Sequence, residues 1–265
     1  MSAAIHPTAI VHPGAVLGEG AEIGPYCVVG ERVTIGAGTQ LLAHVVVAGS
    51  TTIGEACRIY PFSSIGTASQ DRKYSGETAY TKIGRGTTIR EYVTVNRATG
   101  EGQSTIVGDE CLLLAYTHVG HNCVLGNEIT MSNLAQLSGH VVVEDHAWIA
   151  GAAGVHQFCR VGTYSFIGGM SKIVQDVPPY FLAEGNPAEL YGLNSKGLHR
   201  VNFTPEVIAE LKEAFRILYH SGLNRTQALP VLRERVTSGQ GLHLIAFIEA
   251  QSDRGLMKGR PRRAP

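Results

Sequence analysis

Residues 107–149 decide the fold, and they read VGDECLLLAYTHVGHNCVLGNEITMSNLAQLSGHVVVEDHAWI. An apolar side chain recurs at every sixth position of this stretch, from Val107 to Ile149. The same register runs outward to Ile5 and to Ile173, and 26 of its 29 positions are apolar. The three exceptions are Asp71, Glu77 and Glu101. A register that persists over this length predicts a fold made of stacked repeats.

The other positions of the hexad agree with this prediction. Two residues before each apolar position stands a small or β-branched residue, and on a strand both side chains point the same way. All five cysteines occupy this second position, so we expect them to be small buried core residues: Cys27, Cys57, Cys111, Cys123 and Cys159. Directly after the apolar residue stands a frequent glycine, as at Gly24 and Gly120. We expect that glycine to supply the positive φ of a sharp corner.

Two segments interrupt the register. Residues 67–82 are polar, and the shorter segment 98–105 is rich in glycine. Both are predicted to be loops that project from the repeat. Loops on a rigid scaffold often carry function, but the shorter one is more simply interpreted as a tolerated surface insertion.

The apolar spacing changes towards the C-terminus. The repeat is expected to end at residues 175–179, because Pro178 and Pro179 cannot continue a sheet ladder. Beyond Gly192 the spacing is helical, and Thr204 before Pro205 is a typical helix start. We predict helices over 205–219, 226–235 and 243–251. The chain therefore divides into a repeat domain, 1–191, with a projecting loop at about 67–82, and an α-helical domain, 192–265.

The composition argues against several classes of protein. The formal net charge is zero, which argues against a general nucleic-acid binder. The first residues lack the basic and apolar regions of a signal peptide, and no run of about 18 apolar residues could span a membrane. We therefore expect a cytoplasmic protein with free thiols.

The hexad pattern resembles that of the hexapeptide acyltransferase superfamily. The resemblance implies a mainly β fold, a left-handed parallel β-helix with three hexads and 18 residues in each coil. The handedness rests on the resemblance, since general rules favour right-handed parallel crossovers.

The coil length brings histidines together. One coil beyond His121 lies Gly139, beside His140, and two coils beyond lies Gln157, beside His156. Adjacent strands are about 4.8 Å apart, so these rings should line one edge within about 10 Å. Such a cluster could transfer protons, bind a metal, or simply hydrogen-bond along the edge.

Five further motifs are more specific than the repeat: THVGHNC at 117–123, SGHV at 138–141, VHQFC at 155–159, QDVPPY at 175–180 and QDRKY at 70–74. Their order and spacing resemble the UDP-N-acetylglucosamine 3-O-acyltransferase family over nearly the whole chain. The resemblance implies transfer of a long 3-hydroxyacyl group from acyl carrier protein to the sugar 3-position, the first step of lipid A biosynthesis. It implies a homotrimer with no metal and no cofactor beyond the acyl thioester.

The resemblance also assigns residues to roles. His121 matches the general base, and the N–H of Gly139 matches the oxyanion donor. Gly169 matches the position that limits the acyl-chain length, where glycine leaves room for a longer chain. Matched to substrate contacts are Asp71, Lys73, His118, His140, His156, Gln157, Asn194 and Arg200.

Some residues depart from the family pattern. Asn122 stands where an aspartate often follows the base, and Pro187, Lys196 and Val201 also differ. These departures leave open a 3-amino sugar as the acceptor, which would give an amide. Two other classes remain: a zinc enzyme like the γ-class carbonic anhydrases, which use three histidines, and a binding or scaffold module.

Overall fold

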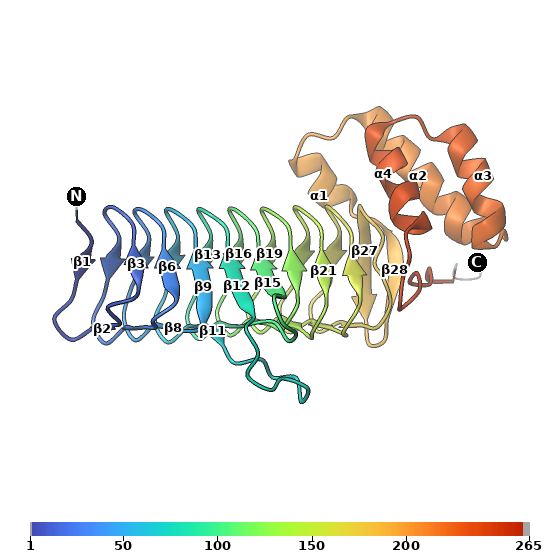
Figure 1. Ribbon diagram of the computed structural model, residues 1–265. Coiled ribbons are helices and arrows are strands. Elements are labelled where there is room, and N and C mark those ends of the chain that lie inside the picture. The colour runs from blue at the N-terminus through green and yellow to red at the C-terminus, as the bar shows by residue number, and fades with distance from the viewer. Residues whose placement is uncertain (1, 262–265) are drawn as a thin grey trace.

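The computed structural model describes residues 2–261 and has the shape of a long prism with a helical cap. The prism is a left-handed parallel β-helix, so the expected fold class is confirmed (Figure 1). Each coil contributes one short strand to each of three sheets, which we call A, B and C. Successive strands of one sheet therefore come from successive coils.

The strands of sheet A are β1 (Ala4–Ile5), β4 (Glu22–Ile23), β7 (Gln40–Leu41), β10 (Arg58–Ile59), β13 (Thr88–Ile89), β16 (Leu112–Leu113), β19 (Thr130–Met131), β22 (Trp148–Ile149), β25 (Phe166–Ile167), β27 (Phe181–Gly185) and β28 (Ala188–Leu193). Those of sheet B are β2 (Ile10–Val11), β5 (Val28–Val29), β8 (Val46–Val47), β11 (Ser64–Thr67), β14 (Thr94–Asn96), β17 (His118–Val119), β20 (Gln136–Leu137), β23 (Gly154–Val155) and β26 (Lys172–Ile173). Those of sheet C are β3 (Val16–Leu17), β6 (Val33–Ile35), β9 (Ser50–Ile53), β12 (Tyr80–Ile83), β15 (Ser104–Val107), β18 (Val124–Leu125), β21 (Val142–Val143) and β24 (Arg160–Val161).

The pairing register confirms the coil of 18 residues. Leu113 of β16 pairs with Met131 of β19, and Val119 of β17 pairs with Leu137 of β20. From Ala21 to Ile173, outside the two interrupting segments, both positions of the hexad that were predicted to face inward are buried, whereas the first coil is partly exposed. All five cysteines are buried free thiols, as expected. Burying one aliphatic side chain stabilises a fold by roughly 1.5–3 kcal/mol, so the stacked core holds the coils together.

The role expected for the glycine after the apolar residue is wrong. Positive φ occurs two residues later in the corner, for example at Tyr26 (58°) and His140 (61°). Gly24 and Gly120 are not among the residues with positive φ. A Cβ on Gly24 would lie 1.7 Å from the carbonyl oxygen of Leu42 in the next coil. These glycines therefore let consecutive coils approach closely, and they do not make the corner turn.

The three edges of the prism are named by the sheets they join. The B–C edge follows each strand of sheet B, the C–A edge follows sheet C, and the A–B edge follows sheet A. Both insertions leave the prism at the B–C edge, at 68–79 between β11 and β12 and at 97–103 between β14 and β15. The longer insertion projects furthest (Figure 1). The predicted loop was slightly too long, because Thr67 and residues 80–82 belong to β11 and β12.

The prism continues beyond its predicted end. Pro178 and Pro179 lie in a corner, after which β27 pairs in parallel with β25, and β28 returns antiparallel to β27. This hairpin was not predicted, because the proline pair looked like a terminator. Sheet A therefore reaches Leu193 before the helices begin.

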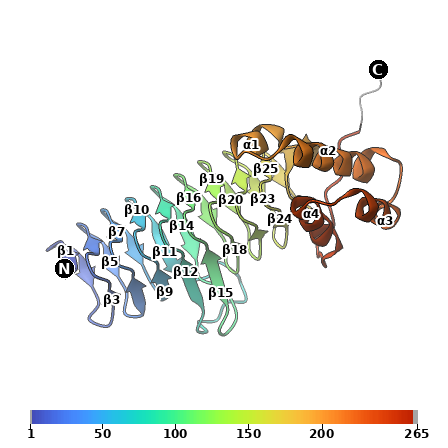
Figure 2. The same cartoon turned by 90° about the horizontal axis from the view of Figure 1, so that it is seen from above.

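Four helices pack at this end of the prism (Figures 1 and 2). They are α1 (Ser195–Arg200), α2 (Pro205–His220), α3 (Arg225–Arg235) and α4 (Gly239–Glu249). Thr204 caps α2 as predicted, whereas α4 starts before the predicted His243, and the short α1 was not predicted. No helix within residues 2–261 is long and apolar enough to cross a membrane.

A buried ion pair ties the helices to the prism. Arg160 Nε lies 2.8 Å from Asp176 Oδ2, and the Asp176 side chain is fully buried. The Arg160 guanidinium also donates to the carbonyl of Phe247 in α4 and lies over its ring. The two domains are thus fixed against each other near the B–C edge.

Candidate functional site

Two histidines meet at the B–C edge. The rings of His121 and His140 are perpendicular, with centroids 5.2 Å apart, and His140 stacks on Phe158 at 4.7 Å. The neighbouring coils hold them there, because the N–H of His140 donates to the carbonyl of His121. The predicted proximity of His121 and His140 along one edge is therefore present. Phe158 was not singled out from the sequence, although it follows His140 by one coil at the same corner position.

Gly139 lies directly beneath the His121 ring. A Cβ built on Gly139 would be 2.4 Å from His121 Nε2, so only glycine admits the imidazole in this place. Among residues 2–261 the N–H of Gly139 donates to no acceptor. One peptide N–H and one imidazole nitrogen are thus side by side, which is the arrangement that a proton acceptor and an oxyanion donor need.

The other ring nitrogen of His121 is held by the next residue. His121 Nδ1 lies 2.9 Å from Asn122 Oδ1, and that oxygen also accepts from the N–H of Thr99 at 2.9 Å. Asn122 Nδ2 donates to the carbonyl of Thr99 at 3.0 Å. An acceptor therefore faces Nδ1, which leaves the lone pair of the neutral ring on Nε2. No sequence pattern pointed to Thr99.

His118 lies on β17, on the outer side of sheet B. Its Nδ1 is 2.8 Å from Thr94 Oγ1 of the neighbouring strand β14. Burial, and secondarily the nearby His121, lower the pKa of His118. His118 is therefore neutral at pH 7 and can act as a hydrogen-bond donor or acceptor beside His121.

The longer insertion reaches this cluster. Burial is the main cause that lowers the pKa of His140, followed by the charge of His121. The charges of Asp71 and Lys73 also act on His140, and Asp71 opposes the shift. Both loop residues therefore lie near enough to His140 for their charges to act on its pKa. His156 and Gln157 lie in the next coil of the same edge, with Gln157 at the corner position of His121 and Gly139.

Asn194 and Arg200 lie elsewhere. They line a cavity of about 780 Å³ on the outer face of sheet A, together with Trp148 and Phe166 of that sheet, Lys196 of α1 and Val201 directly after α1. Asn194 caps α1 and also donates to the carbonyl of Tyr164. In a triangular prism the B–C edge is opposite sheet A. The structure therefore does not bring Asn194 or Arg200 to His121 within one chain.

Gly169 lies on the A–B edge. It is exposed, and a Cβ there would meet only the carbonyl oxygen of Gly151 at 3.4 Å. Gly154 lies on the outer side of sheet B, and a Cβ added to it would have no neighbouring atom within 4 Å. The face of sheet B between His121 and Gly169 is therefore partly bare of side chains.

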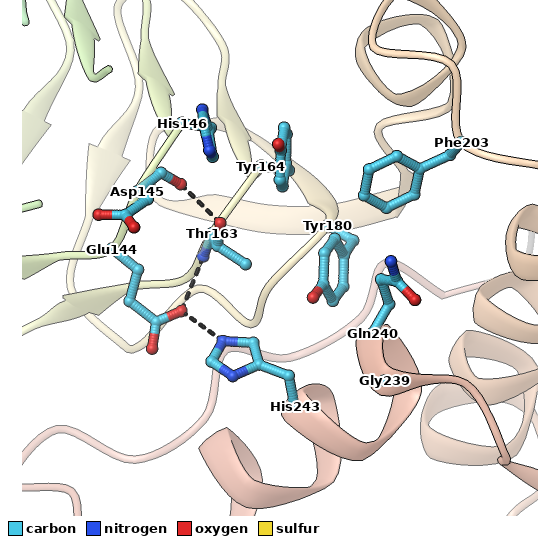
Figure 3. A pocket seen from close by; sticks show the side chains of 10 residues that line it. All are labelled: Glu144, Asp145, His146, Thr163, Tyr164, Tyr180, Phe203, Gly239, Gln240 and His243. Carbon is cyan, nitrogen blue, oxygen red and sulfur yellow. Dashed lines mark hydrogen bonds and ion pairs between the residues drawn. The ribbon is translucent and has the colours of Figure 1, made fainter. Parts of the chain in front are cut away.

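A further cavity of about 570 Å³ opens on the C–A edge, between the prism and α4 (Figure 3). There Glu144 Oε2 accepts from the N–H of Thr163 and lies 2.9 Å from Nε2 of His243 in α4. His146 points into the same hollow and stacks on Tyr164 at 4.4 Å. None of the predicted site residues lines this cavity, so His146 is separate from the B–C cluster. Within residues 2–261 no three His, Cys, Asp or Glu side chains are grouped to hold a metal ion, which gives the zinc alternative no support.

Comparisons with known proteins agree with this geometry. Residues 176–257 match the family described as UDP N-acetylglucosamine O-acyltransferase, domain 2, and residues 2–37 match bacterial transferase hexapeptide repeats. Two curated relatives are named acyl-[acyl-carrier-protein]–UDP-N-acetylglucosamine O-acyltransferase. The one from Thermodesulfovibrio yellowstonii is 46% identical over 96% of this chain and 99% of its own length. The one from Rhizobium johnstonii is 43% identical over 96% of this chain and 94% of its own length.

Solved structures show the same likeness. The UDP-N-acetylglucosamine O-acyltransferase of Moraxella catarrhalis superposes with a TM-score of 0.93 at 41% identity, over 97% of this chain and all of that one. The LpxA structure from Acinetobacter baumannii has a TM-score of 0.93 at 40% identity, over 96% and 99%. The likeness covers the prism and the helical domain together.

Proposed function

The chain belongs to the acyl-[acyl-carrier-protein]–UDP-N-acetylglucosamine O-acyltransferase family, and we propose that it moves a 3-hydroxyacyl group from acyl carrier protein to the 3-hydroxyl of UDP-N-acetylglucosamine. This is the first step of lipid A biosynthesis. The observation that carries the proposal is the close approach of the His121 ring to Gly139, whose N–H donates to no acceptor among residues 2–261.

The chemistry follows from this pair. With Nδ1 facing the Asn122 oxygen, Nε2 of neutral His121 accepts the proton of the sugar hydroxyl. The sugar oxygen attacks the thioester carbonyl carbon, and the Gly139 N–H stabilises the oxyanion, a contribution of about 3 kcal/mol. The C–S bond then breaks, and the imidazolium returns the proton to the departing thiolate. No cofactor takes part in this scheme, and the acyl carrier protein thioester is the co-substrate.

The two separated clusters support a homotrimer. His121, His140, His156 and Gln157 occupy one edge with His118 beside it on sheet B, whereas Asn194 and Arg200 occupy the opposite face. A site that uses both clusters needs the edge of one chain and the face of a neighbour. In a ring with three-fold symmetry each contact is head-to-tail, so it would repeat this pairing three times.

The contacts of the acceptor follow from the same arrangement. Asp71 and Lys73 would contact the sugar from the loop side, together with His118, His140, His156 and Gln157. Arg200 of the neighbouring chain would pair with the diphosphate, because a guanidinium binds phosphate oxygens well. Asn194 would hold the nucleotide beside it. We propose the cytoplasm as the place of action.

The acyl chain would cross sheet B. Its face is free of side chains at Gly154, and Gly169 leaves the far end open. A side chain at position 169 would shorten this path, so we expect Gly169→Met to favour shorter acyl donors in a competition between donors of different length.

A 3-amino acceptor is the second candidate, and the observation in its favour is Asn122. Its amide orients His121 without the charge that an aspartate would add. An uncharged amine is already a nucleophile and needs less help from a base. The product would then be an amide.

The experiment that tests the function is a mass-spectrometric assay with UDP-N-acetylglucosamine, its 3-amino analogue and a panel of 3-hydroxyacyl carrier-protein thioesters. Acyl transfer to either sugar that is lost in His121→Ala would identify the reaction and the acceptor. No product with any donor or acceptor would refute the transferase proposal, and protein-bound zinc would then be measured.

A further inference from the structure

The shorter insertion, 97–103, is more than a surface loop. Its Thr99 makes two main-chain hydrogen bonds to a single side chain, the amide of Asn122. The N–H of Thr99 faces the amide oxygen and the carbonyl of Thr99 faces the amide nitrogen. Only one orientation of the amide satisfies both groups, so the insertion decides which amide atom is turned towards His121.

The insertion is itself firmly held. Its Gly100 N–H donates to Glu77 Oε1 of the longer insertion at 2.8 Å, and Glu101 Oε2 accepts from the N–H of Thr78 at 3.0 Å. Peptide donors, first that of Gly100, lower the pKa of Glu77 to about 2, so its carboxylate stays charged at neutral pH. Ser69 Oγ lies 2.6 Å from Thr99 Oγ1. The two insertions therefore form one connected unit above the His121 corner.

We propose that insertion 97–103 is a positioning element for catalysis: the peptide groups of Thr99 fix the amide of Asn122, and the amide oxygen fixes His121 as the tautomer protonated on Nδ1. A flipped amide would turn its NH₂ group towards Nδ1. The proton would then move to Nε2, and the ring could not accept the proton of the acceptor. This inference rests on His121 being the base of the proposed function.

The backbone of Asn122 makes this mechanism possible without strain. Asn122 has a φ of 60°, which asparagine, aspartate and glycine adopt most readily. Its N–H is already bonded to Thr105 Oγ1 at 2.8 Å. The main chain at Asn122 is thus anchored, and Thr99 controls which way the side-chain amide is turned.

The test compares four proteins. The first lacks residues 98–103, one complete hexad, so the register of the following strands is kept. The second adds Asn122→Asp to this deletion. Thr99→Pro keeps the chain length but removes the N–H donor and the hydroxyl and fixes φ. Thr99→Ala is its matched control, because it also lacks the hydroxyl but retains both peptide groups. Each is compared with wild type by circular dichroism, kcat, KM and the ¹⁵N resonances of labelled histidine, with His121→Ala used for assignment.

The deletion is expected to show both His121 tautomers. Its kcat should fall about tenfold, a part of the 10²- to 10⁴-fold that general base catalysis contributes, with KM for the nucleotide sugar unchanged. Asn122→Asp should restore most of kcat, because a carboxylate accepts from Nδ1–H in either orientation. It should also move the acidic limb of the kcat/KM profile to higher pH, since the carboxylate stabilises the protonated ring. Thr99→Ala should keep the single Nδ1-protonated tautomer, because both peptide groups of residue 99 remain.

A deletion protein that keeps the single Nδ1-protonated tautomer would overturn the proposal, as would a loss of kcat that Asn122→Asp does not restore. If the deletion does not fold, Thr99→Pro carries the same test, with an expected effect in the same direction and smaller. The tautomer is read without substrate. A failure of the proposed function would therefore leave this result intact.

Discussion

The A–B and B–C edges of the prism have the same backbone and different contents. On the A–B edge five rings at equivalent corner positions stack in one column, with centroids 4.7–4.9 Å apart: Tyr26, His44, Phe62, Tyr92 and Tyr116. On the B–C edge His140 stacks on Phe158 in the same way, but His121 stands perpendicular to His140, and two insertions cover the corner.

The comparison separates structural rings from chemical ones. His44 and His140 share a positive φ and a stacked aromatic neighbour. His44 has aromatic rings on both faces. His140 has a ring on one side and the imidazole of His121 on the other, with charges from the loop nearby. The B–C edge differs from the A–B edge in two ways. The column of stacked rings is interrupted at His121, and the Gly139 peptide with its unbonded N–H lies against the His121 ring.

The largest expected effect comes from the histidines themselves. His121→Ala should reduce kcat by about 10²- to 10⁴-fold, because the proton acceptor is lost. His44→Ala removes a histidine from the A–B column and should leave kcat unchanged. Equal losses in the two variants would mean that the two edges do not differ in chemistry.

Glycines at the same corner position give the second test. In Gly139→Ala the new Cβ would overlap the His121 ring, which must move away from the peptide N–H. We expect kcat to fall by about 10²- to 10³-fold, the size seen when an oxyanion donor is lost. Gly151→Ala is the control on the A–B edge, where the Cβ would meet only the carbonyl oxygen of Asn133 at 3.3 Å. Wild-type kcat in Gly139→Ala would contradict the assigned role.

The aromatic column gives a smaller, structural effect. Tyr92 stacks between Phe62 and Tyr116. Tyr92→Ala should lower stability by about 1 kcal/mol and the melting temperature by a few degrees, because both stacking contacts are lost. Its kcat should match wild type at a temperature where both proteins are folded. A large loss of kcat with an unchanged melting temperature would place the A–B edge in the reaction.

The smallest effect is electrostatic. Lys73 lowers the pKa of His140 and Asp71 raises it. We therefore expect Lys73→Ala to raise the pKa of His140 and Asp71→Asn to lower it further, as followed by NMR titration. No change in either variant would show that Asp71 and Lys73 do not approach His140 in solution.

Much of the fold was predictable because the hexad register is strict. The same register led to one wrong prediction, the positive φ expected at the glycine after each apolar residue. A glycine needed for close contact between coils cannot be told in sequence from one needed for positive φ. The hairpin of β27 and β28 was missed because Pro178 and Pro179 lie in a corner just before it. The short α1 offers too few residues for a helical pattern.

The site was predictable where coil arithmetic applies, as for His121, Gly139 and His140. Counting residues per coil could not predict that Asn194 and Arg200 lie on the opposite face, because both residues follow the end of the repeat. It also gave no sign of Thr99, because the insertion that carries it has no periodic pattern and its contacts exist only in three dimensions.

The central claim is that a complete site combines the B–C edge of one chain with sheet A of its neighbour. The most direct test co-expresses His121→Ala and Arg200→Glu chains with different tags, isolates the mixed oligomers and measures acyl transfer. Either variant alone should be inactive or nearly so. In every mixed trimer one of the three sites would pair an intact edge with an intact face, so activity should reappear. If the site lay within one chain, every site would carry one lesion, and mixed oligomers without activity would contradict the account.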